Sequence, residues 1–237
     1  MEKDKELRLQ PRLQCLADLV PSGARLADVG TDHAYLPVWL LTHGRIRRAV
    51  ASDINAAPLA HARRVAEAYG VAESIDFRLC AGLDAIRRDE ADTVAIAGMG
   101  GETILTILKN AAWDWTGAAL LLQPMTKPEL LRRWLTENGF HITSEHLARD
   151  KGVIYVVIQA STGQSPPLTN AEAWCGTGVP YDPLYGEYVR DRIKRLERAE
   201  SGIRQAKTVD SVELETLNSD ITELRRKIRE WEDANRT

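Results

Sequence analysis

Cysteine is scarce in this chain, and long apolar runs are missing. Of its 237 residues only three are cysteines, Cys15, Cys80 and Cys175, and no two have the Cys-x-x-Cys spacing of a zinc or redox site. No apolar stretch approaches the ~20 residues that a membrane helix needs. The charged N-terminus lacks the apolar segment of a secretory signal. We therefore expect a cytoplasmic protein with no membrane association and no bound metal.

The chain also lacks an excess of positive charge. Its 31 lysines and arginines are outnumbered by 34 aspartates and glutamates, so no general positive field attracts nucleic acid. RNA binding would then depend on local basic clusters. Such clusters occur at Arg45, Arg47 and Arg48, at Arg63 and Arg64, at Arg132 and Arg133, and at Arg190, Arg192, Lys194, Arg195 and Arg198. Charged helix faces are more often solvated surface than phosphate sites, so each cluster alone supports RNA binding only weakly.

Short apolar runs alternate with amphipathic segments before residue 140. The expected strands cover residues 25–30, 48–53, 75–79, 93–97 and 118–122, and the expected helices cover 7–20, 37–42, 58–69 and 127–137. This alternation indicates a parallel sheet. Residues 140–159 break it with a predicted β-hairpin. An antiparallel pair ending a parallel sheet is similar to the methyltransferase variant of the Rossmann fold, so we predict that α/β class.

The C-terminal third has a different pattern. A polar segment rich in proline and glycine at residues 160–167 predicts a boundary between two domains, 1–162 and 163–237. Asp182 followed by Pro183 is typical of a helix start, and Asp210 with Glu213 resembles a capping box. Heptad-like apolar stripes follow both, which predicts an antiparallel, coiled-coil-like helical hairpin. The same stripes would also suit pairing between two chains, as in an oligomerisation module.

The turn after the first expected strand carries two acids and a glycine. Gly30 would let a ligand approach the backbone closely. Asp32 and His33 stand where dinucleotide-binding turns have glycines, and two carboxylates would repel a pyrophosphate. Asp28 and Asp32 would instead attract a cationic amine and sulfonium, which favours S-adenosylmethionine over NAD. An ordinary strand–turn–helix connection remains the alternative for this short motif.

Two further loops complete a predicted cofactor site. Asp53 ends the second strand about 20 residues after Gly30, where an acid can bind both ribose hydroxyls, and we assign Ile54 to the site beside it. Asp53 as a helix cap is the alternative. After the third strand we expect backbone contacts to adenine from residues 81–83. These are Ala81, Gly82 and Leu83, with Asp84 as a weaker candidate and a simple connecting loop as the alternative.

The loop after the fourth strand contains small residues. Ala97 and Gly98 are expected at the cofactor, and Met99 and Gly100 at the substrate. Enzymes that methylate exocyclic amines usually have an Asn/Asp-Pro-Pro-aromatic turn here, and this chain has none. Its glycines leave room for a flat ring, which is compatible with attack by a ring nitrogen. A tight packing turn would explain the same residues.

Several of these strings together resemble one family. They are Asp28-Val-Gly-Thr-Asp-His-Ala-Tyr-Leu-Pro37, Ala97-Gly-Met-Gly-Gly101, Gln123-Pro124, Leu131-Arg-Arg-Trp-Leu135 with Asn138-Gly139, the entry segment 9–13 with Arg12, and Gly152 with Tyr155. They resemble the TrmK family over essentially the whole chain. That resemblance implies a cytoplasmic bacterial enzyme that methylates N1 of adenine 22 in the tRNA D-loop with S-adenosylmethionine, and it places Arg12 at the cofactor. The chain departs from the family pattern at Cys80-Ala81, because we expect a Gly-Asp or similar polar pair at these positions in its relatives.

Within that interpretation the residues take provisional roles. Asp32 and His33 are the catalytic candidates, for stabilising the cationic product and for orienting the base or moving a proton. Tyr35 is a candidate for stacking on the base. Arg190, Lys194 and Arg195 are the candidates for binding tRNA, and no obligate protein partner is evident. His33 could instead only hold its loop, and Asp32 could contact the cofactor ammonium. The alternatives for the whole chain are a methyltransferase acting on a small molecule or protein, and a non-catalytic protein that binds S-adenosylmethionine or RNA.

Overall fold

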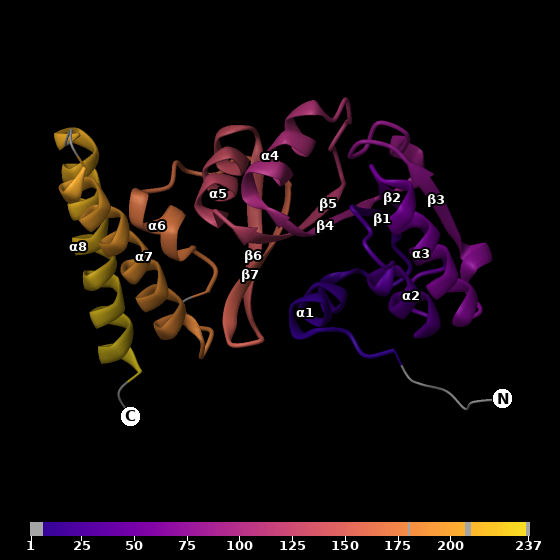
Figure 1. Ribbon diagram of the computed structural model, residues 1–237, viewed down its shortest axis with the longest axis horizontal. Coiled ribbons are helices and arrows are strands. Elements are labelled where there is room, and N and C mark those ends of the chain that lie inside the picture. The colour runs from indigo at the N-terminus through magenta and orange to yellow at the C-terminus, as the bar shows by residue number, and fades with distance from the viewer. Residues whose placement is uncertain (1–6, 180, 207–209, 236–237) are drawn as a thin grey trace.

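The computed structural model of the protein describes residues 7–179, 181–206 and 210–235. A seven-stranded sheet in the order β3-β2-β1-β4-β5-β7-β6 forms its centre (Figure 1). The strands are β1 (Arg25–Val29), β2 (Arg48–Asp53), β3 (Ile75–Leu79), β4 (Thr93–Gly100), β5 (Ala119–Thr126), β6 (Phe140–Asp150) and β7 (Val153–Thr162). The first five run parallel, and β7 is antiparallel to both neighbours. The predicted α/β class is confirmed.

Helices cover both faces of this sheet. The helices that flank the sheet are α1 (Pro11–Leu19), α2 (Tyr35–Thr42), α3 (Ala56–Ala68), α4 (Gly101–Asn110) and α5 (Pro128–Glu137), with short 3-10 turns at Ala72–Ser74 and Arg88–Glu90. Helices α6 (Asn170–Cys175), α7 (Tyr185–Gln205) and α8 (Ser211–Ala234) follow the sheet in the chain. Side chains alternate along a strand, so β4 sends Val94 and Ile96 toward α4 and α5, and Ala95 toward α1 and α2. The sheet therefore lies between two layers of helices, with α4 and α5 on one side and α1 and α2 on the other (Figure 1).

The structure corrects several predicted boundaries. Residues 7–10 are not helical, because Gln10 is extended and Pro11 starts α1. Strand β4 continues past residue 97 to Gly100, since Gly98 adopts a positive φ in a bulge that preserves pairing with β5. Helix α7 begins at Tyr185, so the predicted start at Asp182 is wrong. Asp182 instead closes a turn, in which its carboxylate accepts the Leu184 amide at 2.8 Å. Helices α4 and α6 were not predicted.

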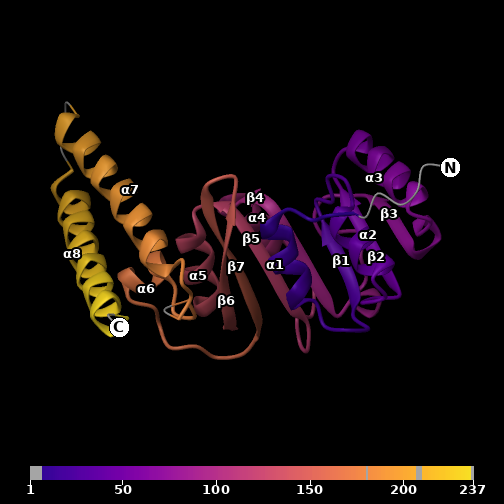
Figure 2. The ribbon, with the colours of Figure 1, turned by 90° about the horizontal axis from the view of Figure 1, so that it is seen from below.

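The two long C-terminal helices form the predicted antiparallel pair. Arg190 pairs with Glu232 and Glu197 with Arg225, so residue numbers rise along α7 as they fall along α8. Asp210 caps α8 by accepting the amides of Val212 and Glu213, both at 3.0 Å. Both views place the pair at the end of the molecule beyond β6, opposite β3 (Figure 2).

A buried ion pair of the sheet domain is hydrogen-bonded to the C-terminal segment that carries the hairpin. The side chains of Arg132 of α5 and Glu145 of β6 are each 0% exposed, and they meet at 2.6 Å. Arg132 also donates to the Ala173 carbonyl at 2.8 Å and to the Tyr188 hydroxyl at 3.2 Å. Glu145 accepts the Thr177 amide at 2.9 Å. The prediction of Arg132 in an RNA-binding cluster is therefore wrong, because its guanidinium has no contact with solvent.

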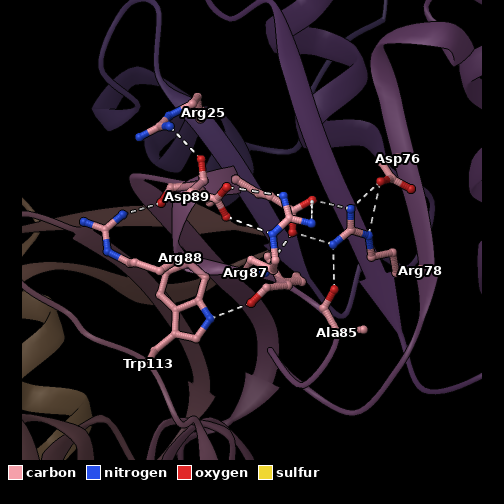
Figure 3. A network of polar contacts seen from close by, with 11 residues as sticks. Arg25, Asp76, Arg78, Ala85, Arg87, Arg88, Asp89 and Trp113 are labelled. Carbon is pink, nitrogen blue, oxygen red and sulfur yellow. Dashed lines mark hydrogen bonds and ion pairs between the residues drawn. The ribbon is translucent and has the colours of Figure 1, made fainter.

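A second polar network lies at the opposite, amino-terminal edge of the strands (Figure 3). Arg78 of β3 donates to both carboxylate oxygens of Glu90 at 2.7 Å and to the Ala85 carbonyl at 2.6 Å. These hydrogen bonds hold the pKa of Glu90 down, at about 2. Arg25 donates to the Asp89 carbonyl, and Trp113 to that of Ile86. The network anchors residues 85–90, which follow the loop 80–84 at the carboxyl edge of the sheet.

Candidate active site

Two adjoining clefts lie at the carboxyl ends of β1 to β4. Open α/β sheets bind ligands at this edge. One cleft, of about 510 Å³, extends over the end of β2, the loop 80–84 and helix α4. The other, of about 590 Å³, extends over α1, the turn after β1 and the end of β4. Gly30, Asp53 and Met99 line both, so the two clefts are parts of one site.

The first cleft gathers six predicted cofactor residues. They are Gly30, Asp53, Ile54, Ala81, Gly82 and Leu83, and Asp84 joins them. Asp53 accepts the Asn55 amide at 2.8 Å, and Asn55 itself is the N-cap of α3, so the capping alternative for Asp53 is wrong. Helix α4 adds lining residues that the sequence analysis missed together with the helix: Glu102, Thr103, Thr106, Ile107 and Asn110.

The second cleft gathers the remaining predicted residues of the sheet domain except one. Arg12, Asp28, Asp32, His33, Tyr35, Ala97 and Gly98 line it. Gly100 lines neither cleft and instead forms the N-cap of α4, so the structure does not place it with the other substrate candidates. Arg190, Lys194 and Arg195 lie on α7, in the hairpin, and line neither cleft.

Asp28 is a buried acid at the edge of this cleft. Its carboxylate accepts the Thr31 hydroxyl at 2.5 Å. Burial raises the pKa of Asp28 to about 6, although the hydrogen bond from Thr31 opposes that shift. A carboxyl group titrating near neutrality at a ligand cleft is suited to binding a cationic group, which would favour its ionised form.

Gly30 keeps the backbone open where the two clefts meet. Its φ of +75° is a left-handed conformation that favours glycine. A Cβ at this position would lie 1.8 Å from Cε of Met99, so the methionine side chain already packs directly on the glycine. Gly30 and Met99 line both clefts, so a ligand that spans the two would lie against them.

Arg12 is held in place by residues from distant strands. Its Nη1 donates to Oε1 of Gln123 at 2.9 Å, and the same oxygen accepts the Gly98 amide at 3.2 Å. Its Nε lies 3.2 Å from a carboxylate oxygen of Asp150. Gln123 is fully buried and Asp150 nearly so. Sequence reasoning assigned no role to Asp150 and singled out Gln123 only within a family motif, because strand pairing alone brings these residues to α1.

His33 lies among aromatic side chains and one acid. Its ring stacks on Tyr35 with 5.1 Å between centroids and meets His61 of α3 edge-on at 4.2 Å. Its Nε2 is 3.4 Å from a carboxylate oxygen of Asp32, whose side chain is 80% exposed. Its Nδ1 is buried without a hydrogen-bond partner. His61 was not predicted as part of the site, because its contact with His33 joins α3 to the loop after β1 and no local sequence pattern shows it.

The α7 cluster is only partly available to a ligand. Arg192 is buried with its guanidinium over the Tyr188 ring, Arg190 pairs with Glu232, and Arg195 pairs with Asp191. Lys194 and Arg198 are exposed and form no ion pair with any residue of the part that the structure describes. Arg190, Lys194 and Arg198 follow at four-residue steps, so they share one face of the helix.

Comparison with known proteins agrees with this geometry. Residues 9–158 match the methyltransferase domain family. The tRNA (adenine(22)-N(1))-methyltransferase of Bacillus subtilis is 37% identical over 159 residues, which is 67% of each chain. The crystal structure of B. subtilis TrmK superimposes with a TM-score of 0.84 at 28% identity, covering 94% of this chain and 100% of that one. A Streptococcus pneumoniae protein in complex with S-adenosyl-L-methionine has a TM-score of 0.82 at 30% identity, covering 93% and 100%.

The sheet order, the open turn at Gly30 and the acid at the end of β2 define a class I methyltransferase domain. Within that class, the sequence identity and the superposition over nearly the whole chain are decisive. The chain belongs to the TrmK family of tRNA (adenine(22)-N(1))-methyltransferases, as its motifs predicted. Among the described residues, no helix is both long and apolar enough to span a membrane.

Proposed function

We propose that this protein transfers the methyl group of S-adenosylmethionine to N1 of adenine 22 in the D-loop of tRNA, in the cytoplasm. The observation that carries the proposal is the pair of clefts joined at Gly30. One is suited to an adenosine group and the other to an amino-acid group and an incoming base. Family membership adds the substrate, because a relative with 37% identity bears the name of that activity.

The residues present fit the cofactor. Asp53 at the end of β2 would accept hydrogen bonds from the ribose hydroxyls, and the backbone of residues 81–83 would face the adenine ring. Asp28 and Arg12 would hold the charged amino-acid end, with Gly30 giving the close approach between them. When bound, S-adenosylmethionine supplies a methyl group activated by the neighbouring sulfonium.

The second cleft would then orient the target base. Neutral adenine N1 has an in-plane lone pair, so attack needs no prior deprotonation, and alignment is the main requirement. Tyr35 and His33 would stack on the base after it leaves its own stack, which costs a few kcal/mol. The exposed carboxylate of Asp32 would stabilise the positive charge of the methylated product.

The helical hairpin would bind the body of the tRNA. We assign residues 163–237 to this unit, with Lys194 and Arg198 as phosphate contacts and Arg190 and Arg195 beside them. A small-molecule or protein substrate is the second candidate. It gains no support from the exposed basic face on α7, which suits a large polyanion better.

The decisive experiment supplies labelled S-adenosylmethionine and tRNA that lacks its own modification. We expect 1-methyladenosine at position 22, identified by mass spectrometry of the digested tRNA. Cofactor binding without methyl transfer would instead favour the small-molecule or protein substrate. No cofactor binding would exclude the proposed activity altogether.

Cofactor binding is expected to weaken as the pH falls below about 6. Burial raises the pKa of Asp28 to about 6, so the carboxyl group becomes neutral below that pH and loses its attraction for the cofactor ammonium. Affinity should fall up to about tenfold per pH unit below that value. Calorimetric titration at several pH values measures it. The Asp28→Asn variant should bind weakly with little pH dependence, and an unchanged slope in that variant would contradict the assignment.

Loss of the two unpaired cations on α7 is expected to weaken tRNA binding. The Lys194→Ala/Arg198→Ala variant should raise KM for tRNA about fivefold and reduce the salt dependence of binding by about two counterions, because each cation neutralises one phosphate. The Kd for S-adenosylmethionine should not change. Arg229→Ala on α8 removes a charge from the other helix and serves as the control. Because Arg229→Ala removes one charge and the double variant two, an effect half as large in the control would assign the loss to general charge.

A further inference from the structure

His33 lines the second cleft, where the proposed reaction places the target base. Hydrogen bonds do little to fix the orientation of its ring. Its Nε2 is 3.4 Å from a carboxylate oxygen of Asp32. That carboxylate is largely in solvent, so its electrostatic attraction for the imidazole is weak. Its Nδ1 is buried and has no hydrogen-bond partner. The orientation of this imidazole must therefore come from packing.

The packing comes from two rings on different helices. Tyr35 of α2 lies nearly parallel to His33, with 25° between the ring planes, and is itself partly exposed. His61 of α3 stands almost perpendicular to His33, with 79° between the planes and only 4.2 Å between centroids. Such an edge-to-face contact is a favoured aromatic geometry, and it places His61 against the His33 ring beside its stack with Tyr35.

His61 is well placed to be the fixed member of this group. It is half-buried and lies between Leu59 and Ala62, which anchor α3 against the rest of the domain. Helix α3 also contacts α2, which carries Tyr35. A residue on a packed helix holds its neighbour more rigidly than a residue on a loop does. His33 itself sits on the loop after β1, where its own backbone supplies no such restraint.

We propose that His61 is a positioning residue for methyl transfer, which keeps His33 stacked with Tyr35 as the wall that receives the target base. The proposal rests on the proposed function, because the base is the adenine of that reaction. His61 does not line either cleft, so its effect on the reaction passes through His33.

A double-mutant cycle tests this coupling. The full chain would be assayed on unmodified tRNA as wild type, His33→Ala, His61→Ala and the double variant. We expect His61→Ala to lower kcat/KM for tRNA about fivefold, within the range known for aromatic pairs. In the His33→Ala background the same change should cost less than about twofold, because the ring that it positions is gone. His61→Phe should restore activity to within about twofold of wild type, since it keeps the edge-on contact.

Two further readouts separate positioning from a structural role. The Kd for S-adenosylhomocysteine and the melting temperature should stay near the wild-type values in His61→Phe, and the matched control Glu67→Ala, also on α3, should leave all values unchanged. An equal loss on both backgrounds, or no rescue by phenylalanine, would overturn the proposal.

If His61→Ala fails to fold, His61→Phe and His61→Leu replace it in the cycle, with leucine expected to lose activity. A wild type that binds cofactor but leaves tRNA unmethylated would refute the proposed function and this inference together, whereas additivity in an active enzyme refutes only the inference.

Discussion

The Gly30→Ala variant is expected to bind S-adenosylmethionine at least about 100-fold more weakly than the wild type, while remaining folded. The loss of affinity comes from the new methyl group, which occupies the space 1.8 Å from Cε of Met99, where a ligand spanning both clefts would lie. Alanine in a left-handed conformation with φ of +75° also costs about 1 kcal/mol of folding free energy, which lowers stability but not affinity. Isothermal titration with S-adenosylmethionine measures the loss in affinity, and circular dichroism measures the fold.

Gly23→Ala is the matched control for this variant. Gly23 has a similar φ of +79°, and a Cβ there would meet nothing within 4 Å. It should therefore show the backbone cost alone, with cofactor affinity unchanged. Shortening Met99 in the Gly30→Ala/Met99→Ala variant should not restore binding, because the alanine methyl itself blocks the cofactor. Near-normal affinity in Gly30→Ala would mean that the cofactor does not cross this glycine.

The parts of the site that the sequence predicted are those that depend on local structure. Gly30 and Asp53 each follow a short buried strand, and parallel strands bring their carboxyl ends to one edge of the sheet. That Gly30 and Asp53 lie close together in the fold therefore follows from the order of strands and helices along the chain. The sign of the charge at Asp28 and Asp32 was likewise sufficient to favour a cationic cofactor over a pyrophosphate.

The missed residues depend on tertiary contacts. Gln123 and Asp150 reach Arg12 only because β5 and the β6–β7 turn lie beside α1, and His61 reaches His33 only because α3 lies beside the loop after β1. Helix α4 was missed because it begins directly at the glycine run 98–101, which indicates a loop to any local criterion. The sequence pattern around any one of these residues gives no indication of such contacts.

The helical period of α5 distinguishes Arg132 from its neighbour Arg133. Pro128, Leu131, Arg132 and Leu135 recur at three- and four-residue steps, and all four are buried on the inner face of α5. Counting adjacent arginines placed Arg132 with its partly exposed neighbour Arg133 in a surface cluster. The helical period would have assigned them to different faces. An arginine within an apolar stripe indicates a buried partner, which here is Glu145.

Removal of that arginine is expected to destabilise the protein strongly. Arg132→Met leaves the Glu145 carboxylate buried without its counter-ion, and breaking a buried ion pair in this way costs about 3–5 kcal/mol. The melting temperature should fall by about 10 °C for a chain of this size. The loss should be concentrated where α6 and α7 meet the sheet, because Arg132 also bonds the Ala173 carbonyl and the Tyr188 hydroxyl.

Neutralising the partner distinguishes charge from packing. Arg132→Met/Glu145→Gln removes both charges and keeps an oxygen to accept the Thr177 amide, so it should recover at least about half of the lost stability. Arg133→Met, which loses only a hydrogen bond to Asn170, should cost less than about 1 kcal/mol. Urea unfolding measures all three, and limited proteolysis should release the hairpin first in Arg132→Met. A double variant no more stable than Arg132→Met would show that arginine packing, and not the unpaired carboxylate, dominates. In that case the hairpin is held to the methyltransferase domain mainly by its apolar contacts, among them Tyr188, Val189 and Leu196.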